Sequence, residues 1–281
     1  MSHSDTVWYN KTMKNEIKLV ALDLDGTLLN SSKEISAENV SAIEAARKKD
    51  VHVVLTTGRP LVAIQPYLKR LEMLDFKDFS ITFNGGLVQR NTGQIVSKKS
   101  FSYEQISAIK RLTTALGLPC DILSEEKVFV TKSAVASQYE TLNKLLTFMK
   151  MDFADVPQNV VYNKIVSCTE KELLDQRLAE IPERYFEEFE VFKTQAKLLE
   201  FMPKGINKAY GLTQLIHQLD LKPENVMAMG DEANDLSMIA WAGYGVAMAN
   251  AVPAVKEEAK IISDWTNDQH AVAKVLETYV L

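Results

Sequence analysis

The chain has 281 residues, of which 46% are hydrophobic and 25% are charged, and its formal net charge is −5. The length suits two domains, and the composition is typical of a soluble globular protein. The mild negative charge argues against a nucleic-acid-binding protein, because that class neutralises backbone phosphates with a basic surface. No nucleic-acid partner is therefore expected.

The N-terminal residues 1–14 are mixed and polar, which predicts a disordered extension. They lack the apolar core of a secretory signal, so we expect a cytoplasmic location. The apolar runs in the chain have the length of strands and not of membrane spans, so no membrane partner is expected. The two cysteines, Cys120 and Cys168, have no metal-ligand spacing and are interpreted as lone thiols.

Residues 15–86 alternate between strand and helix patterns and are predicted to form the first part of a core domain. A helix is expected to start after Ser36, and Pro60 suits the first turn of another helix. A β-α-β-α-β order indicates a parallel sheet with right-handed crossovers. The predicted strands are 17–22, 51–55 and 80–83.

The middle of the chain, residues 87–203, has a different pattern and is predicted to be an inserted domain. A turn at residues 91–93 predicts a hairpin, and hairpins mixed with helices indicate an α+β fold with an antiparallel sheet. The predicted hairpin strands are 87–90 and 94–97. Further strands are expected near 122 and 128 and at 160–167, 190–192 and 197–201, with helices at 103–116, 138–149 and 170–179.

The alternating pattern returns in residues 204–281, which are predicted to complete the core domain. The fold class is therefore α/β, with a Rossmann-like parallel-sheet core interrupted by an inserted α+β domain. The predicted elements are helices at 207–219, 235–240 and 254–259 and from 269 onwards, with strands at 225–229 and 243–247.

Two aspartates, Asp23 and Asp25, follow the first apolar strand in the segment Asp-Leu-Asp-Gly-Thr, which ends at Thr27. Carboxylates beside a buried strand are costly without ionic partners, and a hard divalent cation is one such partner. One carboxylate can also attack phosphorus, and the other can act as general acid and base. The alternative is a turn with two solvated aspartates, which the apolar flanks Leu22 and Leu28 disfavour.

Three further segments fall at the ends of predicted core elements, where parallel sheets bind ligands. Thr57 and Gly58 form a strand-to-helix turn that suits phosphate oxygens, although an ordinary turn has the same residues. Lys208 opens a helix and can neutralise charge on a transferring phosphoryl group, with a solvated lysine as the alternative and Lys204 as a competitor.

The third segment, Gly-Asp-Glu-Ala-Asn-Asp, crowds three acids and an amide into one strand-to-helix junction. Asp231 can complete a metal site, Asn234 can donate to a phosphate oxygen, and Asp235 can hold neighbouring donors in place. The alternative is an acidic helix cap.

Taken in order, these four segments resemble the motifs of the haloacid dehalogenase-like superfamily, and matches extend from Ile17 to the end of the chain. They include residues 243–251. The position of the insert resembles the C2 cap of the Cof-type branch, which includes bacterial sugar-phosphate phosphatases. One departure from the family pattern is Ala209, which follows Lys208 where the family usually has glycine. The approach of Lys208 to the site is therefore expected to differ slightly.

The resemblance implies a magnesium-dependent phosphatase that works through an aspartyl-phosphate. It implies that Asp23 is the nucleophile and a Mg²⁺ ligand, and that Asp25 is the acid/base and binds the metal through its carbonyl group. The second aspartate favours phosphoryl transfer over dehalogenation. The remaining implied roles are Asp231 as metal ligand, Thr57, Gly58, Lys208 and Asn234 as phosphate-binding residues, Thr27 and Asp235 as supporting residues, and Arg59 and Asn84 as substrate contacts.

Two other functions stay open at this point. A phosphomutase on the same scaffold would need an anion site in its insert, where the strongest basic cluster is Lys98-Lys99. A non-catalytic phosphate sensor would need neither a nucleophile nor an acid/base residue. The chain has residues of both types, which disfavours the sensor. The expected partner is a small phosphomonoester, and the expected assembly is a monomer or homodimer.

Overall fold

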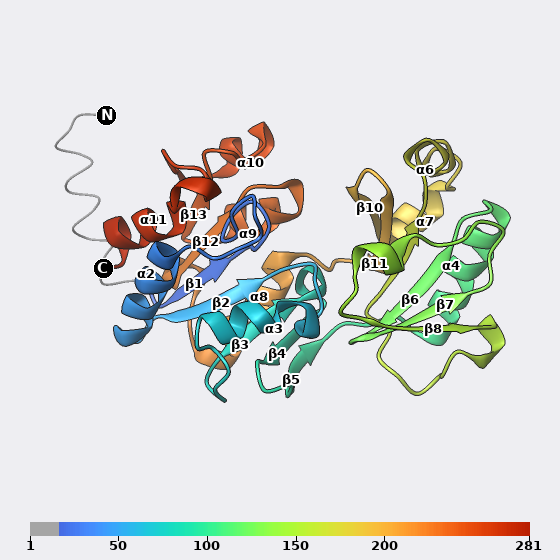
Figure 1. Cartoon of the computed structure of the whole chain (residues 1–281), viewed down its shortest axis with the longest axis horizontal. Coiled ribbons are helices and arrows are strands. Elements are labelled where there is room, and N and C mark those ends of the chain that lie inside the picture. The colour runs from blue at the N-terminus through green and yellow to red at the C-terminus, as the bar shows by residue number, and fades with distance from the viewer. Residues whose placement is uncertain (1–16) are drawn as a thin grey trace. The chain divides into compact units, whose positions relative to one another are not determined.

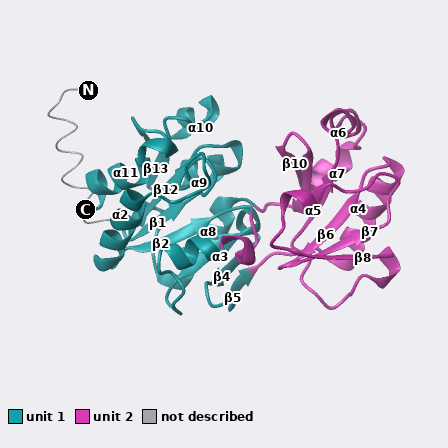
Figure 2. Ribbon diagram, viewed as in Figure 1, with its two compact units in different colours: residues 1–58, 65–97, 207–281 teal, residues 59–64, 98–206 magenta. Residues whose placement is uncertain are grey.

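A computed structural model describes residues 17–281 and shows two compact units (Figure 2). The first unit comprises the described part of residues 1–58 together with 65–97 and 207–281, and the second comprises 59–64 and 98–206. The predicted extension at residues 1–14 lies outside the described residues. Among those described, no helix has both the length and the apolar character that crossing a bilayer requires.

The first unit is built on an eight-stranded sheet in the order β14-β13-β12-β1-β2-β3-β4-β5 (Figure 1). The strands from β14 to β3 pair in parallel, and β4 pairs antiparallel with β3. The strands are β1 (Leu19–Leu22), β2 (His52–Thr56), β3 (Phe79–Thr82), β4 (Leu87–Arg90), β5 (Ile95–Lys98), β12 (Val226–Gly230), β13 (Tyr244–Ala247) and β14 (Ile261–Ile262). This sheet confirms the predicted α/β class with a parallel core.

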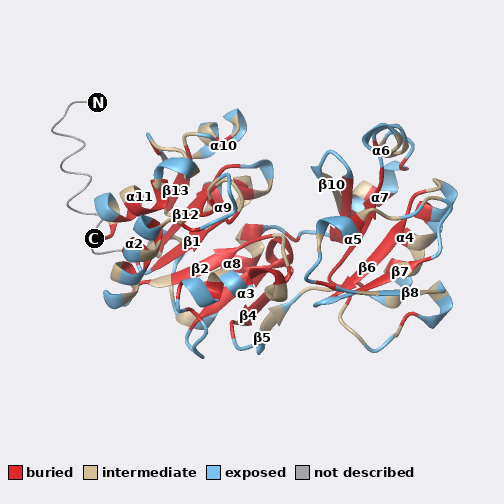
Figure 3. Ribbon diagram, in the orientation of Figure 1, coloured by how far each residue is buried: buried red, intermediate tan, exposed pale blue. Residues whose placement is uncertain are grey.

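Burial explains why β1 and β12 sit at the centre of that sheet. Every residue of both strands is buried, as the red central arrows in Figure 3 show. Continuous apolar runs of this kind are typical of parallel strands covered on both faces. Around the sheet, α2 packs with α11, and α9 packs with both α8 and α10. The helices are α2 (Ala37–Lys48), α3 (Leu61–Arg70), α8 (Lys208–Leu219), α9 (Leu236–Trp241), α10 (Pro253–Glu258) and α11 (Ala271–Tyr279), with short 3₁₀ turns η1 (Phe83–Gly85), η3 (Pro223–Asn225), η4 (Ala233–Asp235) and η5 (Asn267–Gln269).

The second unit has a six-stranded sheet in the order β10-β11-β9-β6-β7-β8. All neighbours are antiparallel except β7 and β8, which are parallel. One sheet face carries Ile122, Phe129 and Phe201 in a buried core with α4, α6 and α7. The elements are β6 (Cys120–Ser124), β7 (Lys127–Thr131), β8 (Thr147–Met151), β9 (Lys164–Cys168), β10 (Phe189–Gln195), β11 (Leu198–Pro203), α4 (Tyr103–Ala115), α5 (Tyr139–Leu142), η2 (Phe153–Asp155), α6 (Lys171–Leu178) and α7 (Glu183–Glu188). Cys120 and Cys168 are both free, as predicted, and the structure buries both.

The helix predicted at 138–149 is wrong. The structure has only one helical turn, α5, and then strand β8, which pairs in parallel with β7. Leu142, Leu145 and Met149 have helical spacing, yet all three are exposed, so their spacing does not reflect burial. Without β8, the backbone of β7 would lie at the open edge of the sheet, where its N–H and C=O groups would lack strand partners. Strand pairing therefore overrides the helical pattern.

The predicted boundaries of the insert, residues 87 and 203, also need correction. The hairpin strands exist, but β4 and β5 extend the first sheet, and the register of β4 begins with Thr82 opposite Leu87. The second unit accordingly begins at Lys98 and runs to Ile206, with the addition of 59–64. A hairpin pattern identifies two paired strands but not the sheet that they join.

Candidate active site

The candidate site begins where β1 ends, at Asp23. The backbone N–H of Asp23 donates to the carbonyl oxygen of Met229 at 3.0 Å, so the strand pairing of β1 with β12 continues up to this residue. Leu24, Leu28 and Leu29 are fully buried and anchor the loop that follows. Asp23 itself is buried, at 6% exposure. The alternative of a solvated turn therefore does not hold for Asp23.

Lys208 lies against the carboxylate of Asp23. Its Nζ donates to Asp23 Oδ1 at 2.5 Å and to Asp235 Oδ1 at 2.6 Å, and its side chain has no exposed surface. The competitor Lys204 instead belongs to the second unit, where it donates to the carbonyl oxygen of Phe186. The structure thus distinguishes the two lysines and excludes the solvated alternative for Lys208.

Close packing of α8 allows Lys208 to reach this depth. Asn207 caps the helix, since its side chain accepts from the N–H of Tyr210 at 2.9 Å. A Cβ placed on Gly211 would lie 2.8 Å from the Cα of Gly85, and one on Gly85, whose φ is +101°, would lie 2.0 Å from the Asn207 carbonyl oxygen. The close approach thus depends on Gly85 and Gly211. The expected effect of Ala209 on the approach of Lys208 stays a prediction.

The loop after β12 supplies two more carboxylates. Asp235 Oδ2 accepts from the N–H groups of Asp231 and Glu232, at 2.9 and 3.1 Å, which fixes the turn. Asp231 Oδ1 accepts from Thr27 Oγ1 at 2.9 Å. Both aspartates are buried, so the acidic segment is more than a solvated helix cap.

The carboxylates of Asp23, Asp231 and Asp235 form a cluster in which one oxygen of each lies within 4.8 Å of one oxygen of the other two. Both oxygens of Asp235 are already engaged, one by Lys208 and the other by backbone N–H groups. Asp235 therefore fits a positioning residue. Asp231 Oδ2 is held less tightly, by one contact of 3.4 Å from Asn250, so Asp23 and Asp231 fit metal ligands better. Three carboxylates against one ammonium leave two excess negative charges, and a hard divalent cation with oxygen ligands would balance them.

The pKa values of the clustered side chains reflect their burial and this excess negative charge. Burial, followed by repulsion from Asp235, raises the pKa of Asp23 to about 8. Burial likewise raises the pKa of Asp231 to about 7. Burial alone would lower the pKa of Lys208, but the carboxylates of Asp23 and Asp235 outweigh it and raise that pKa, so the ammonium stays charged.

Asp25 has a different environment from Asp23. Its side chain is 41% exposed and pairs with the Lys33 ammonium at 2.8 Å. Its backbone forms an isolated parallel bridge with Leu29, so the chain folds back on itself here. A carboxyl that is exposed and held by an exposed lysine can exchange partners readily, which suits a group that must give and take a proton.

The predicted phosphate turn is connected to Asn234 through Asn84. The N–H of Asn84 donates to the Thr57 carbonyl oxygen at 3.0 Å, and Asn234 Nδ2 donates to Asn84 Oδ1 at 3.3 Å. A Cβ on Gly58 would lie 3.0 Å from Asn84 Oδ1. The predicted residues Thr57, Gly58, Asn84 and Asn234 therefore lie together. Arg59, the next residue in the chain, groups with the second unit and stays a prediction as a substrate contact.

Asn250 was not among the predicted site residues. Its Nδ2 donates to the Gly26 carbonyl oxygen at 2.8 Å and to Asp231 Oδ2 at 3.4 Å, and its Oδ1 accepts from the N–H of Asn267. Asn267 in turn donates to the Leu29 carbonyl oxygen at 2.9 Å. Asn250 thus ties the Asp23 loop to the Asp231 loop. Asn250 lies in the stretch 243–251 that resembles the family, which could have marked it as a site residue. The sequence alone does not show which residues it contacts.

Gly26 provides a test of how tightly these loops pack. Its φ is +80°, and an added Cβ would lie 2.2 Å from Asp231 Oδ2. We expect Gly26→Ala to lower the free energy of unfolding by about 2–5 kcal/mol, from left-handed strain plus overpacking, and to weaken divalent-cation binding. Gly93→Ala is the matched control, because its φ is +98° but nothing lies within 4 Å. Chemical denaturation of both variants checks the prediction; equal losses would contradict it.

Comparison with known proteins identifies the family. The model of the haloacid dehalogenase-like hydrolases matches residues 20–276. The chain belongs to this family. The 5-amino-6-(5-phospho-D-ribitylamino)uracil phosphatase YcsE of Bacillus subtilis is 33% identical over 270 residues, covering 95% of this chain and 97% of that protein. The haloacid dehalogenase-like hydrolase of Bacteroides thetaiotaomicron has a crystal structure with a TM-score of 0.82 at 31% identity, covering 93% of this chain and 98% of that one.

A further haloacid dehalogenase-like structure, the subclass IIB sugar phosphatase BT4131, has a TM-score of 0.76 at 25% identity and covers 92% of this chain and 98% of that one. These alignments include both units of the present chain. Membership in the family confirms the resemblance on which the sequence prediction depended, and relatives with phosphatase names support a phosphatase.

Proposed function

We propose that the chain is a magnesium-dependent phosphatase that hydrolyses small phosphomonoesters, with sugar phosphates as its substrate class, through an aspartyl-phosphate. The observation that carries the proposal is the buried contact between Asp23 and Lys208, beside the Asp231 carboxylate. A relative that acts on a phosphoribityl compound and a structural neighbour that is a sugar phosphatase support the substrate class.

In the proposed mechanism, a carboxylate oxygen of Asp23 attacks phosphorus while the bond to the leaving oxygen breaks, which forms an acyl phosphate on Asp23. The protonated Asp25 donates its proton to the departing alkoxide, after releasing Lys33. Asp25 then takes a proton from water as the water attacks phosphorus, and inorganic phosphate leaves with Asp23 regenerated. The Lys208 ammonium balances charge on the phosphoryl oxygens.

The other residues of the site have positioning roles in this proposal. Thr57, Gly58 and Asn234 bind the phosphoryl oxygens, and Asp235 holds the Lys208 ammonium in place through the 2.6 Å contact. Asp23, Asp231 and the carbonyl group of Asp25 would hold Mg²⁺. When bound, Mg²⁺ lowers the repulsion between the attacking carboxylate and the phosphate dianion. Thr27 supports Asp231.

The test of the function is a panel of phosphomonoesters assayed with and without Mg²⁺. We expect release of inorganic phosphate that requires the metal, with sugar phosphates among the good substrates. An isomerised sugar phosphate without net phosphate release would instead indicate the phosphomutase. Absence of turnover on every ester, together with binding of phosphate, would indicate the sensor.

Metal binding should depend on pH in a defined direction. The folded-state pKa values of Asp23 and Asp231, about 8 and about 7, lie above the ordinary value of 3.8. Their contribution to the stability of the metal-free protein is thus full below about pH 4 and lost as the pH rises through about 7–8. We expect the metal-free protein to melt at a lower temperature at pH 8.5 than at pH 6.

The same groups must lose protons to bind Mg²⁺. The apparent affinity should therefore rise on the order of tenfold per pH unit for each proton released, up to about pH 7 for Asp231 and about pH 8 for Asp23, and then level off. Thermal melts across a Mg²⁺ titration at several pH values measure both effects. The Asp231→Asn variant serves as the control, because it should reduce both pH dependences. A metal-free melting temperature that rises from pH 6 to pH 8.5 would contradict the account.

A further inference from the structure

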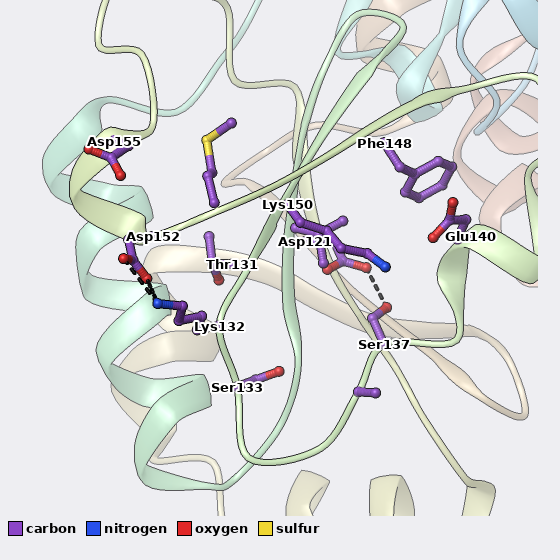
Figure 4. A pocket seen from close by; sticks show the side chains of 13 residues that line it. Asp121, Thr131, Lys132, Ser133, Ser137, Glu140, Phe148, Lys150, Asp152 and Asp155 are labelled. Carbon is purple, nitrogen blue, oxygen red and sulfur yellow. Dashed lines mark hydrogen bonds and ion pairs between the residues drawn. The ribbon is translucent and has the colours of Figure 1, made fainter.

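A cavity lies within the second unit, and none of its lining residues belongs to the candidate active site. It is a cavity of ≈ 650 Å³ between β6, β7, β8 and the segment that leads into α5 (Figure 4). This volume is in the range of pockets that bind small molecules. Polar and charged residues outnumber apolar ones in its lining, which comprises Asp121, Val130, Thr131, Lys132, Ser133, Ala136, Ser137, Glu140, Phe148, Lys150, Met151, Asp152 and Asp155.

The cavity occupies the sheet face opposite the apolar core of this unit. Side chains alternate between the two faces of a strand. Ile122 and its partner Phe129 point into the core with α4, so the preceding Asp121 and its partner Val130 point to the other face. Asp121 therefore lies at the base of a polar site built on a rigid sheet.

Asp121 is the residue that points to a ligand. It is 1% exposed, and its Oδ2 accepts a hydrogen bond from Ser137 Oγ, which Figure 4 shows as a dashed line. Its Oδ1 is buried and has no hydrogen-bond partner among the described residues. A buried carboxylate oxygen without a donor is costly, and a ligand donor would remove that cost. Burial also raises the pKa of Asp121 to about 6, as expected for a poorly solvated carboxyl.

The charges around the cavity indicate which kind of donor fits. Lys132 pairs with Asp152 at 2.8 Å, so these two charges offset each other. The other charged side chains of the lining are three acids and one base, namely Asp121, Glu140, Asp155 and Lys150. A net negative lining repels phosphate and carboxylate groups and attracts a cation.

We propose that this cavity binds the primary ammonium group of a small hydrophilic amine, with the carboxylate of Asp121 as its main acceptor. Glu140, which is exposed at the rim, adds electrostatic attraction. The proposal does not depend on the phosphatase activity, since it concerns the second unit alone. Amino sugars and aliphatic diamines both carry an ammonium group, but only amino sugars also carry hydroxyl groups. Comparing the two therefore shows whether the site also needs hydroxyl groups on its ligand.

The test is calorimetric titration of the wild-type full chain, without metal, with glucosamine, putrescine and glucose. We expect millimolar-range or tighter binding of at least one amine, and glucose should bind at least about tenfold more weakly than glucosamine or putrescine. Stronger binding of glucosamine would assign the site to amino sugars, and stronger binding of putrescine would assign it to aliphatic amines. Failure of both amines to bind, or glucose binding as tightly as the better amine, would overturn the proposal.

Three variants locate the site. Asp121→Asn should weaken amine binding by about tenfold or more, because it removes the buried charge while keeping the size of the side chain. Glu140→Gln should weaken it by a smaller factor, and it tests the site even if Asp121→Asn does not fold, because Glu140 is exposed. Glu172→Gln, an exposed residue of α6 outside the cavity lining, removes the same charge and should leave binding unchanged. Unaltered binding in the first two variants would overturn the proposal.

Discussion

Replacing Asp23 with asparagine should lower kcat on a generic phosphomonoester by a factor on the order of 10⁴ or more, the scale expected when a nucleophile is removed. The amide cannot form an acyl phosphate, and it also loses one of the proposed metal ligands. The loss should appear in kcat under saturating Mg²⁺, so that weaker metal binding is not its only cause. Asparagine fills nearly the same volume in this buried position.

The matched control for this variant is Asp220→Asn. Asp220 is an exposed residue that ends α8 with φ +54°, a conformation that asparagine also tolerates. It makes the same chemical change outside the site, and activity should stay within about twofold of the wild type. Turnover by Asp23→Asn that matches this control would show that Asp23 is not the nucleophile.

Replacing Lys208 with methionine should reduce both stability and activity. Methionine removes the ammonium that lies between Asp23 and Asp235, so two buried carboxylates face each other without a counter-charge. Removing one partner of a buried ion pair costs about 3–5 kcal/mol. The loss should be greater at pH 8 than at pH 5, because the carboxylates can take up protons at the lower pH.

Chemical denaturation at the two pH values measures the stability effect, and phosphate release measures the catalytic one. Lys204→Met is the matched control: the Lys204 side chain is 51% exposed and pairs with Glu190 at 3.5 Å in the second unit. It should cost less than about 1 kcal/mol. If Lys208→Met is as stable and active as Lys204→Met, then the ammonium has neither a structural nor a catalytic role.

The site could be predicted from sequence because its residues lie at the ends of buried strands. Asp23 follows β1 and Asp231 follows β12, and these two strands are neighbours with parallel register. The pattern of apolar runs places both strand ends at one sheet edge, and the family motifs name the side chains. The local pattern left Lys204 as a competitor of Lys208, the family motif favoured Lys208, and the structure places Lys208 against Asp23.

The parts that could not be predicted depend on contacts between distant segments. The pattern at 138–149 fits a helix locally, but pairing of β8 with β7 decides the outcome. Asn250 contacts residues more than 200 positions earlier in the chain, at Gly26. The lack of a hydrogen-bond donor for Asp121 Oδ1 can be recognised only from the positions of the surrounding residues in the structure. Local patterns contain none of this information.

The most direct test of the central claim is to trap the covalent intermediate. Enzyme that is turning over a good substrate with Mg²⁺ would be quenched in acid and treated with borohydride, which reduces an acyl phosphate to an alcohol. Mass spectrometry of the digested protein then locates the altered residue. The account predicts conversion of Asp23 to homoserine, in wild-type protein and only after exposure to substrate. Modification of Asp25 or of another residue, with Asp23 intact, would contradict it.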